Sequence, residues 1–487
     1  MATPRLHVPT WLLMTALVLA EITSTFEASM AFVALPTLSR QFGDPLMASW
    51  TISAFFIVSA GTAALFARLG DIYGRRRLLI IVLLVAAIGS LVSACSQTLA
   101  GVIAGRMLQG VTGAVLPLCL GLIRENLPPR LVSMCIGIMG GVVGVSAGLG
   151  FLVAGYLLDH IQWQGMFFFS TTVAVLGALA VRLVVPRSEP APDGRQLDIL
   201  GGLYFVPAIS CVMLALSLSR NGWAQWHVVG LLILGLSLLA IWARHEWRHP
   251  NPLIDIRLFS DRRILLANVV FGLLAVGPML YPQVLLSLAQ QPLWTGAGLG
   301  LTATAAAVLK QPGTFMGFVA GPIGGRIATR YGSRQAMLTG TLIVALGWAP
   351  ALIDMNAFSM LLLTVGMQAF GMVVLYGAVS NQIVDAAPSR RTSEALGLAQ
   401  VTRSTFTAVG SQVIATLLAY STVAGDSPSS GTYPSATAYS LAFGYLVAVS
   451  CASVIAAWLL PRAKPTPDRK EKDAQEGEVA APATPRP

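Results

Sequence analysis

The chain is a succession of apolar segments, each about 17 to 25 residues long and therefore long enough to cross a hydrocarbon core of about 30 Å as a helix. Apolar residues make up 55% of the 487 positions, and charged residues make up only 11%. Because lipid offers no hydrogen bonds to the backbone, such segments are stable as helices that satisfy their own polar groups. This composition excludes a soluble enzyme and predicts an all-α integral membrane protein.

Fourteen such segments follow one another, and we expect each of them to form a transmembrane helix. The eighth is the shortest. The expected helices are Trp11–Leu35, Ser49–Phe66, Leu78–Ala94, Leu99–Ile123, Leu131–Leu157, Trp163–Val185, Ile199–Leu218, Val228–Trp242, Ile264–Leu288, Leu299–Ile323, Met337–Ile353, Phe358–Ile383, Leu396–Leu418 and Ala438–Leu460.

The basic residues test this count, because the cytoplasmic loops of membrane proteins carry an excess of Lys and Arg. With fourteen helices, nearly all of the 31 lysines and arginines fall on one side of the membrane. The exceptions are Arg40 and Arg220 on the other side and Arg106, Lys310 and Arg403 inside helices. We therefore expect both termini in the cytoplasm and a location in the cell's plasma or inner membrane. The net charge of +10 then reflects topology rather than binding of nucleic acid.

A short basic loop occurs twice, as ARLGDIYGRRR at Ala67–Arg77 and as GRIATRYGSRQ at Gly325–Gln335. Aligning Gly74 with Gly332 gives an offset of 258 residues, which maps helices one to five onto helices nine to thirteen and the sixth onto the fourteenth. Helices seven and eight have no counterpart. Two like bundles in one chain suit alternating access around a site near the middle of the membrane.

The repeat divides the chain into five parts. We predict two pseudo-symmetric six-helix bundles, a central helix pair between them, and a tail that is disordered because it has little to bury. The parts are a cytoplasmic N-terminus at 1–10, an N-terminal bundle at 11–186, cytoplasmic loops with helices seven and eight at 187–263, a C-terminal bundle at 264–460 and a cytoplasmic tail at 461–487. We expect a monomer.

The first basic loop resembles the signature loop of the major facilitator superfamily, G-x-L-x-D-x-x-G-R-R, which joins the second and third helices. The matching residues are Leu69, Asp71, Gly74, Arg75 and Arg76. Ala67 replaces the first glycine, and the second copy of the loop carries Thr329 at the position of Asp71. Gly74 allows a tight turn, and Asp71 can offset the arginines beside it. The resemblance implies that Asp71, Gly74, Arg75 and Arg76 latch the cytoplasmic ends of the two bundles.

Charged residues inside membrane helices are costly and mark functional sites. Arg106 belongs to RMLQGVTGA, which resembles the R-x-x-Q-G-x-x-G-A motif of the superfamily and contains Gln109. The first helix supplies two acids, Glu21 and Glu27. Its FEASMAFVALP stretch is similar to the first helix of fourteen-helix drug antiporters, with Glu27 where those usually have Asp. Arg106 thus needs a partner, and the first helix can supply it.

Glu27 is the acid that we expect to couple protons to transport. Burial favours a neutral acid whereas a nearby arginine favours a carboxylate, and a proton-coupling site requires this competition. We predict that Glu27 carries the proton or senses the charge of the substrate. We also predict that Arg106 adjusts the proton affinity of Glu27. The alternative is a permanent ion pair that only orients two helices. Glu21 and Glu27 are about 120° apart around a helix, so we do not expect them to share one site.

The fifth helix departs from the pattern of the drug antiporters. Their G-P-x-x-G-G motif should fall at GFLVAG, but Phe151 replaces the proline and Ala154 replaces the first of the paired glycines. Small residues still recur along this helix and predict close packing against another helix. The glycines concerned are Gly140, Gly144, Gly148, Gly150 and Gly155. The packing face is retained, whereas the association of this motif with proton antiport is only partly carried over.

The second half carries two more cations within its helices. Lys310 is followed by Gln311 and Pro312, and such an interruption by a helix breaker often marks a binding site. Arg403, in VTRSTFTAVG, resembles an arginine of fourteen-helix drug antiporters. We predict that Lys310 and Arg403 line the substrate path. For Lys310, the alternative is a side chain that snorkels toward an interface.

Taken with the resemblance, these features favour a secondary transporter that exports a lipophilic or amphiphilic compound in exchange for protons. We expect lipid, protons and a small-molecule substrate as partners, no cofactor besides the proton gradient, and no enzymatic activity. The alternatives are a proton symporter or facilitator for an organic acid, favoured by three intramembrane cations against two acids, and a non-transporting sensor.

One motif suggests a different class of protein. HEWRH at His245–His249 fits the H-E-x-x-H zinc motif. No third ligand is evident, and Pro250 ends the helix at once. The segment is then a basic helix end at the cytoplasmic interface, and a zinc membrane protease is the alternative.

Overall fold

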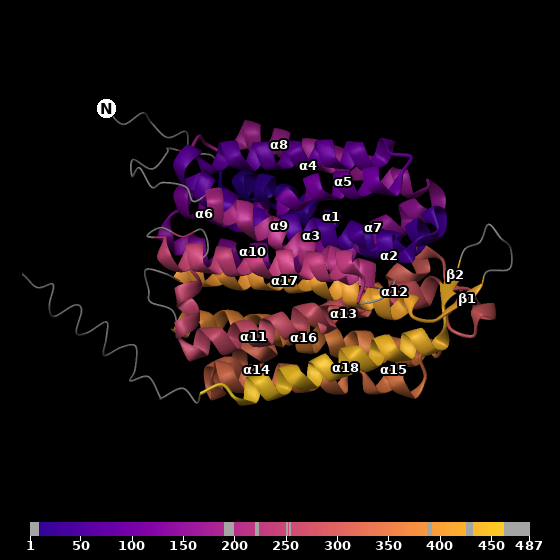
Figure 1. The fold of residues 1–487 in the computed structure, drawn as a ribbon. Helices are drawn as coiled ribbons and strands as arrows, with labels where there is room; N and C mark the ends of the chain where they lie inside the picture. The colour runs from indigo at the N-terminus through magenta and orange to yellow at the C-terminus, as the bar shows by residue number, and fades with distance from the viewer. Residues whose placement is uncertain are drawn as a thin grey trace, which may run out of the picture.

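The computed structural model describes residues 9–188, 199–219, 224–249, 252, 255–386, 392–424 and 432–461. The tail that we predict to be disordered, nearly all of the N-terminal segment 1–10 and most of the loop 187–198 lie outside these residues. The helices run side by side along one direction, with the two halves of the chain stacked against each other (Figure 1).

The N-terminal half contains the first six expected spans. Its elements are α1 (Thr10–Phe42), α2 (Pro45–Ala48), α3 (Trp50–Tyr73), α4 (Arg75–Cys95), α5 (Leu99–Gln109), η1 (Gly110–Ala114), α6 (Val115–Asn126), α7 (Pro129–His160) and α8 (Trp163–Val184). Together, α5, η1 and α6 form one span that changes to a tighter helix in its middle. The helix pair α9 (Ile199–Leu218) and α10 (Trp226–Arg248) follows.

The C-terminal half repeats this series with two interrupted spans. Its helices are η3 (Ile256–Ser260), α11 (Arg262–Val276), η4 (Pro278–Leu280), α12 (Tyr281–Gln290), η5 (Leu293–Thr295), α13 (Ala303–Tyr331), α14 (Ser333–Leu346), α15 (Ala349–Ile353), α16 (Phe358–Ala386), α17 (Thr392–Ala419) and α18 (Ala436–Trp458). Strands β1 (Thr422–Ala424) and β2 (Thr432–Pro434) pair antiparallel between α17 and α18. This hairpin is a small departure from the all-α prediction.

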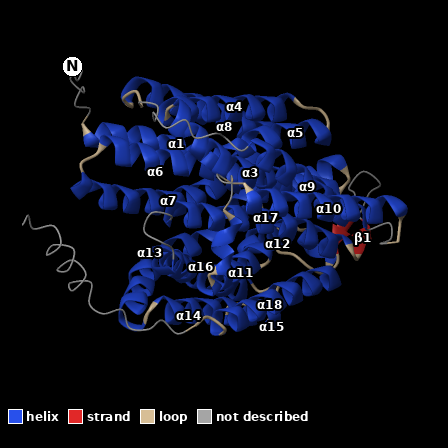
Figure 2. Ribbon diagram, turned by 60° about the vertical axis from the view of Figure 1, so that its left-hand side comes forward, coloured by secondary structure: helices blue, strands red, loops and turns tan. Residues whose placement is uncertain are grey.

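Two ends of the bundle are distinguished by their loops. The basic end carries the turns at Gly74 and Gly332, where α3 meets α4 and α13 meets α14. Both glycines have positive φ, +92° and +88°, a conformation that side chains with a Cβ rarely adopt. The hairpin end carries β1 and β2, which lie together at one edge of the bundle in both views (Figures 1 and 2).

Eleven described segments are long and apolar enough to cross a membrane. They include every expected span except the seventh, tenth and thirteenth, and these three are the helices α9, α13 and α17. In α13 and α17, charged and polar side chains interrupt the apolar sequence. The eighth span extends beyond its expected bounds to the 23 residues of α10. The chain is a multi-pass membrane protein, and the count of fourteen spans stays a prediction.

The two halves pack their helices in the same way. In the N-terminal half α1 packs against α7 and α8, and α4 packs against α8. In the C-terminal half α11 packs against α17 and α18, and α14 packs against α18. These are the pairs that the offset of 258 residues relates, so the sequence repeat corresponds to a repeat of packing.

The most extensive contacts between the halves are those of α3 with α17 and of α7 with α13. Helix α9 packs against both α3 and α17 and so covers the first of these seams. One cluster of buried apolar side chains extends across both halves, for example from Phe32 to Leu285. A second cluster, with Leu17 and Leu118, belongs to the N-terminal half alone.

The helix break lies in a different span from the one that we expected. Helix α13 continues through Pro312 and Pro322 without interruption, so the expectation of a broken tenth span is wrong. The ninth span breaks instead at Gly277, between α11 and α12. The hydroxyl of Tyr445 donates to the freed carbonyl of Val276 at 2.8 Å, which satisfies a backbone group that lipid would leave unpaired.

Candidate functional site

Glu27 lies enclosed within the N-terminal half. Its side chain is fully buried, and its Oε1 is 3.1 Å from the hydroxyl of Ser90 on α4 and 3.0 Å from that of Ser170 on α8. The second oxygen, Oε2, is buried and has no hydrogen-bond partner. The carboxyl group is thus held by hydrogen bonds through one oxygen only, and the other oxygen has none within the described residues.

Arg106 is also fully buried, and it binds backbone rather than carboxylate. Its Nε donates to the carbonyl of Thr51 at 2.7 Å, and its Nη1 donates to the carbonyl of Glu27 at 2.9 Å. The guanidinium also lies 4.5 Å from the ring centre of Phe55, a favourable cation–π position. Among the described residues no ion pair joins Arg106 to the Glu27 carboxylate, so the permanent ion pair is not what the structure contains.

Gln109 connects the arginine to the acid. Its Oε1 accepts from Arg106 Nη1 at 2.6 Å, and its Nε2 donates to the Ser90 hydroxyl at 2.6 Å. A continuous hydrogen-bonded path therefore runs from Arg106 through Gln109 and Ser90 to Glu27. Sequence reasoning missed Ser90 and Ser170, because a single serine in an apolar helix gives no periodic signal.

Glu21 and Arg403 take no part in the hydrogen-bonded path from Arg106 to Glu27. Glu21 is buried, and the positive charge that acts on its carboxyl group is that of Arg403 in the other half. Arg403 itself is hydrogen-bonded to Gln400 and to the hydroxyl of Tyr376 on α16. Glu21 and Glu27 thus have different neighbours, in agreement with their expected angular separation on α1.

Lys310 extends from α13 between aromatic rings of both halves. Its Nζ lies 5.1 Å from the ring centre of Phe151 on α7 and 4.8 Å from that of Tyr281 on α12. Its neighbour Gln311 donates to the carbonyl of Gly148 at 3.0 Å. Lys310 therefore does not snorkel toward an interface, because its ammonium is held where the halves meet.

Contacts between the halves gather toward the hairpin end. The carboxylate of Asp159, near the end of α7, accepts from the backbone N–H groups of Ala303 and Thr304 at 3.0 and 2.8 Å. It thereby caps the N-terminus of α13 from the opposite half, where a negative charge is favoured. Gln290 of α12 likewise donates to the carbonyl of Val33 on α1 at 3.2 Å. These bonds hold the hairpin end closed.

The glycines of α7 show where the contact between α7 and the C-terminal half ends. A Cβ placed on Gly148 would lie 2.4 Å from Thr314, and one on Gly155 would lie 2.7 Å from the carbonyl of Ala303. Gly150 faces Ser29 of α1 within its own half. Nearer the basic end, a Cβ on Gly140 or on Gly144 would meet no atom within 4 Å, and the same is true of Gly137 and Gly141. Packing of Gly140 and Gly144 against another helix therefore stays a prediction for a different arrangement of the halves.

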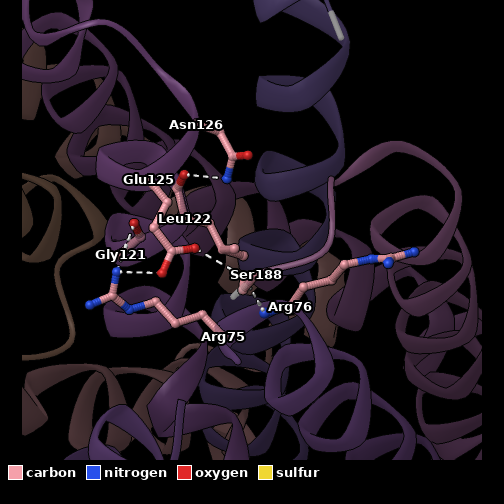
Figure 3. Close-up of polar contacts among 7 residues, drawn as sticks. All are labelled: Arg75, Arg76, Gly121, Leu122, Glu125, Asn126 and Ser188. Atoms are coloured by element: carbon pink, nitrogen blue, oxygen red, sulfur yellow. Dashed lines mark hydrogen bonds and ion pairs between the residues drawn. The ribbon is translucent and has the colours of Figure 1, made fainter. Parts of the chain in front are cut away.

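At the basic end, the signature loop binds within the N-terminal half (Figure 3). Arg75 forms an ion pair with Glu125 at 2.8 Å, and the other oxygen of Glu125 accepts from the hydroxyl of Ser188 at 2.9 Å. The backbone N–H of Arg76 donates to the same hydroxyl at 3.3 Å. A Cβ on Gly74 would lie 3.1 Å from the carbonyl of Ser188. These bonds tie α4 to α6 and to the segment after α8.

Two further sequence features lie toward this end, Asp71 of the signature loop and the HEWRH segment at the end of α10. The side chain of Asp71 lies outside the described residues, so its part in a latch stays a prediction. In the HEWRH segment, Glu246 accepts from the indole N–H of Trp242 at 3.1 Å. Within the described ranges no three His, Cys, Asp or Glu side chains gather as a metal site would.

Comparison with curated proteins gives relatives that are named for export and resistance. The tetracenomycin C resistance and export protein of Streptomyces glaucescens is 25% identical over 423 residues, which cover 84% of this chain and 76% of that protein. A multidrug resistance protein B homolog of Mycobacterium tuberculosis is 26% identical over 340 residues, covering 68% of this chain and 61% of the homolog.

Solved structures share the fold at low sequence identity. A POT peptide transporter in complex with sulfate has a TM-score of 0.67 at 15% identity and covers 92% of this chain and 93% of its own. The xylose transporter XylE of E. coli, in a partially occluded inward open conformation, has a TM-score of 0.60 at 14% identity and covers 94% and 99%. Both likenesses concern the arrangement of helices.

The family model of the Major Facilitator Superfamily matches residues 17–309 and 264–486, which together take in nearly the whole chain. The two like bundles, the signature loop at Gly74 and the Arg106–Gln109 motif in the fourth span agree with that match. The chain belongs to the Major Facilitator Superfamily.

Proposed function

We propose that the chain is a proton-coupled exporter of amphiphilic compounds in the plasma or inner membrane, with both termini in the cytoplasm. The names of its relatives support export, and the excess of basic residues at the basic end supports a cytoplasmic location for that end. On this orientation, the halves are closed toward the outside and apart toward the cytoplasm along α7.

The observation that carries the proposal is the environment of Glu27. This acid is fully buried, is held by two serine hydroxyls at one oxygen and has no ion pair within the described residues. A buried carboxyl group of this kind can exist as a neutral acid or as a carboxylate at moderate cost, whereas a paired one is fixed as an ion. It is thus suited to take up and release one proton per cycle.

Loss of that proton would be transmitted through the hydrogen bonds that surround the acid. A carboxylate can only accept, so both Ser90 and Ser170 would donate to it, whereas the neutral acid can itself donate. Ser90 lies on α4 and Ser170 on α8, and Gln109 connects Ser90 to Arg106. Protonation therefore changes which hydrogen bonds hold α1 against α4, α5 and α8. In the proposed cycle, this change shifts the equilibrium between the two arrangements of the halves.

A pH-dye assay in energised everted vesicles tests this function. A panel of lipophilic cations and organic anions is added to vesicles with the wild type, Glu27→Gln or the control Arg40→Gln. We expect some compounds to release protons from the lumen in the wild type and in Arg40→Gln, and none to do so in Glu27→Gln. If Glu27→Gln still releases protons, another group carries them. If no compound releases protons from wild-type vesicles, antiport is overturned, and uptake assays then decide between an organic-acid carrier and a sensor.

A further inference from the structure

Lys310 is a charged group near the middle of the protein that the proton site does not use. Its ammonium lies between the rings of Phe151 and Tyr281, and no acid within the described residues pairs with it. Cation–π contacts offset part of the cost of holding a charge within the membrane. The site thus offers a positive charge without a counter-charge, together with two flat apolar surfaces.

Lys310 lies between two contacts that join α7 to α13. On α7, Phe151 lies between Gly148, which contacts α13, and Asp159, which caps α13. Lys310 is therefore on the inner side of the contacts that close the hairpin end. It is partly exposed, and on the basic-end side the glycines of α7 face open space. Lys310 thus lies close to the place where the contact between α7 and α13 ends and the open stretch of α7 begins.

The aromatic partners come from the two places where the chain departs from expectation. Phe151 replaces the proline of the antiporter motif, and Tyr281 is the first residue of α12 after the break at Gly277. Phe151 belongs to the N-terminal half, whereas Tyr281 and Lys310 belong to the C-terminal half. The contact therefore exists only while the halves approach each other at this level.

We propose that Lys310, Phe151 and Tyr281 form a substrate subsite for aromatic compounds that carry an anionic group, such as an ionised phenol or a carboxylate. The ammonium pairs with the anion, and the two rings pack against the ring system of the substrate. The enclosed Glu27 does not reach this subsite, so proton binding and substrate binding occupy different places. The proposal deepens the exporter function and rests on it for the direction of transport.

Direct binding tests this assignment without requiring transport. Titration calorimetry on the full-length protein in lipid nanodiscs compares 1-naphthoate with the neutral 1-naphthamide and the cationic 1-naphthylmethylammonium. We expect the wild type to bind naphthoate about tenfold more tightly than naphthamide, which is the effect of one charge-assisted pair. Lys310→Gln removes this preference, so that naphthoate and naphthamide bind about equally. Lys310→Arg retains it, and so does the control Arg40→Gln, which removes a cation outside the subsite.

The rings are tested by variants that keep the ammonium. Phe151→Leu and Tyr281→Leu are expected to weaken naphthoate and naphthamide together by about fivefold and to keep the preference for the anion. Their folding is checked by size-exclusion chromatography, and these variants keep the proposal testable if Lys310→Gln is unstable.

Several outcomes overturn the subsite. Equal binding of naphthoate and naphthamide by the wild type does so, as does a preference that survives Lys310→Gln or the absence of binding of all three probes. The exporter function fails separately. Naphthoate preference without proton release in vesicles overturns antiport and leaves the subsite, whereas proton release driven by cations with no naphthoate preference overturns the subsite alone.

Discussion

The guanidinium of Arg106 donates to the backbone carbonyl of Glu27 at 2.9 Å and leaves the carboxyl group of the same residue to two serine hydroxyls. Arg106 thus fixes the position of α1 without neutralising the acid on it. On the proposed function, this division keeps α1 anchored whether Glu27 is protonated or not.

Arg106→Lys is expected to damage transport although it keeps the charge. The ammonium of lysine cannot replace the planar guanidinium, whose nitrogens donate to the carbonyls of Thr51 and Glu27 and to the side chain of Gln109. At least one buried carbonyl is left unpaired, at a cost of about 1 to 3 kcal/mol. Thermal unfolding in detergent should show a lower Tm, and the vesicle assay a lower rate. A Lys variant with the wild-type Tm and rate would show that the charge alone matters.

Asp159→Ala is expected to open the hairpin end. The variant loses a cap in which a carboxylate from one half accepts from Ala303 and Thr304 of the other, at a cost of about 1 kcal/mol, or about fivefold in population. Distances between spin labels at the exposed positions Ile161 and Leu293, in a background without the five cysteines, measure the shift. The longer-distance population should grow.

The matched control for Asp159→Ala is Asp44→Ala, which removes a cap within the N-terminal half, where the Asp44 carboxylate accepts from the backbone N–H groups of Leu46 and Met47. It removes a helix cap of the same kind without a bond between the halves, so the label distances should stay as in the wild type. Equal shifts in the two variants would mean that Asp159 acts only on helix stability.

Gly144→Leu is expected to fold and yet to block transport. A Cβ on Gly144 meets no atom within 4 Å in this structure, so the Tm should change little. When the basic end closes, the same side chain would separate helices that glycines allow to approach. Gly148→Leu is the contrast, because Thr314 lies 2.4 Å from a Cβ at that position and the Tm should fall. Normal transport by Gly144→Leu would show that this face never packs.

Gly74→Ala is expected to destabilise the basic end. The φ of +92° at Gly74 is unfavourable for alanine by about 1 to 3 kcal/mol, and the new methyl group would press on the carbonyl of Ser188 at 3.1 Å. Glu125→Gln, which removes the partly exposed ion pair with Arg75, should cost less, about 0.2 to 1 kcal/mol. Tm values of both variants check the order, and a larger loss for Glu125→Gln would contradict it.

Much of the helix plan could be predicted from the sequence, because length and apolar content are local properties. The repeat at Gly74 and Gly332 also predicted which helices pack alike. The break at Gly277 was not predicted, although Gly277 and Pro278 are adjacent there. Pro312 gives the same helix-breaker signal in the tenth span, and the sequence alone does not distinguish the two. A proline within α13 is tolerated because neighbouring helices cover the backbone around it.

The candidate site was predictable only in part. Charged residues in apolar helices are conspicuous, so Glu27, Arg106 and Lys310 could be named. Their partners could not, because Ser90, Thr51 and Tyr281 are ordinary residues whose importance depends on the three-dimensional approach of separate helices. The backbone carbonyl of Glu27 could not be predicted as a partner of Arg106 either, because every residue has such a carbonyl.

Helix α9 shields one of the two seams between the halves, the α3–α17 seam, from the surrounding lipid. It packs against α3 and α17, and Val206 fills the space beside Gly61, so acyl chains are kept away from that seam. The described residues place no such helix over α7 and α13, where the glycines from Gly137 to Gly144 face open space. On the proposed export function, an amphiphile in the membrane leaflet would meet a covered flank at α3 and α17 and an uncovered one along α7 and α13, and we expect cargo to enter from the bilayer along the second.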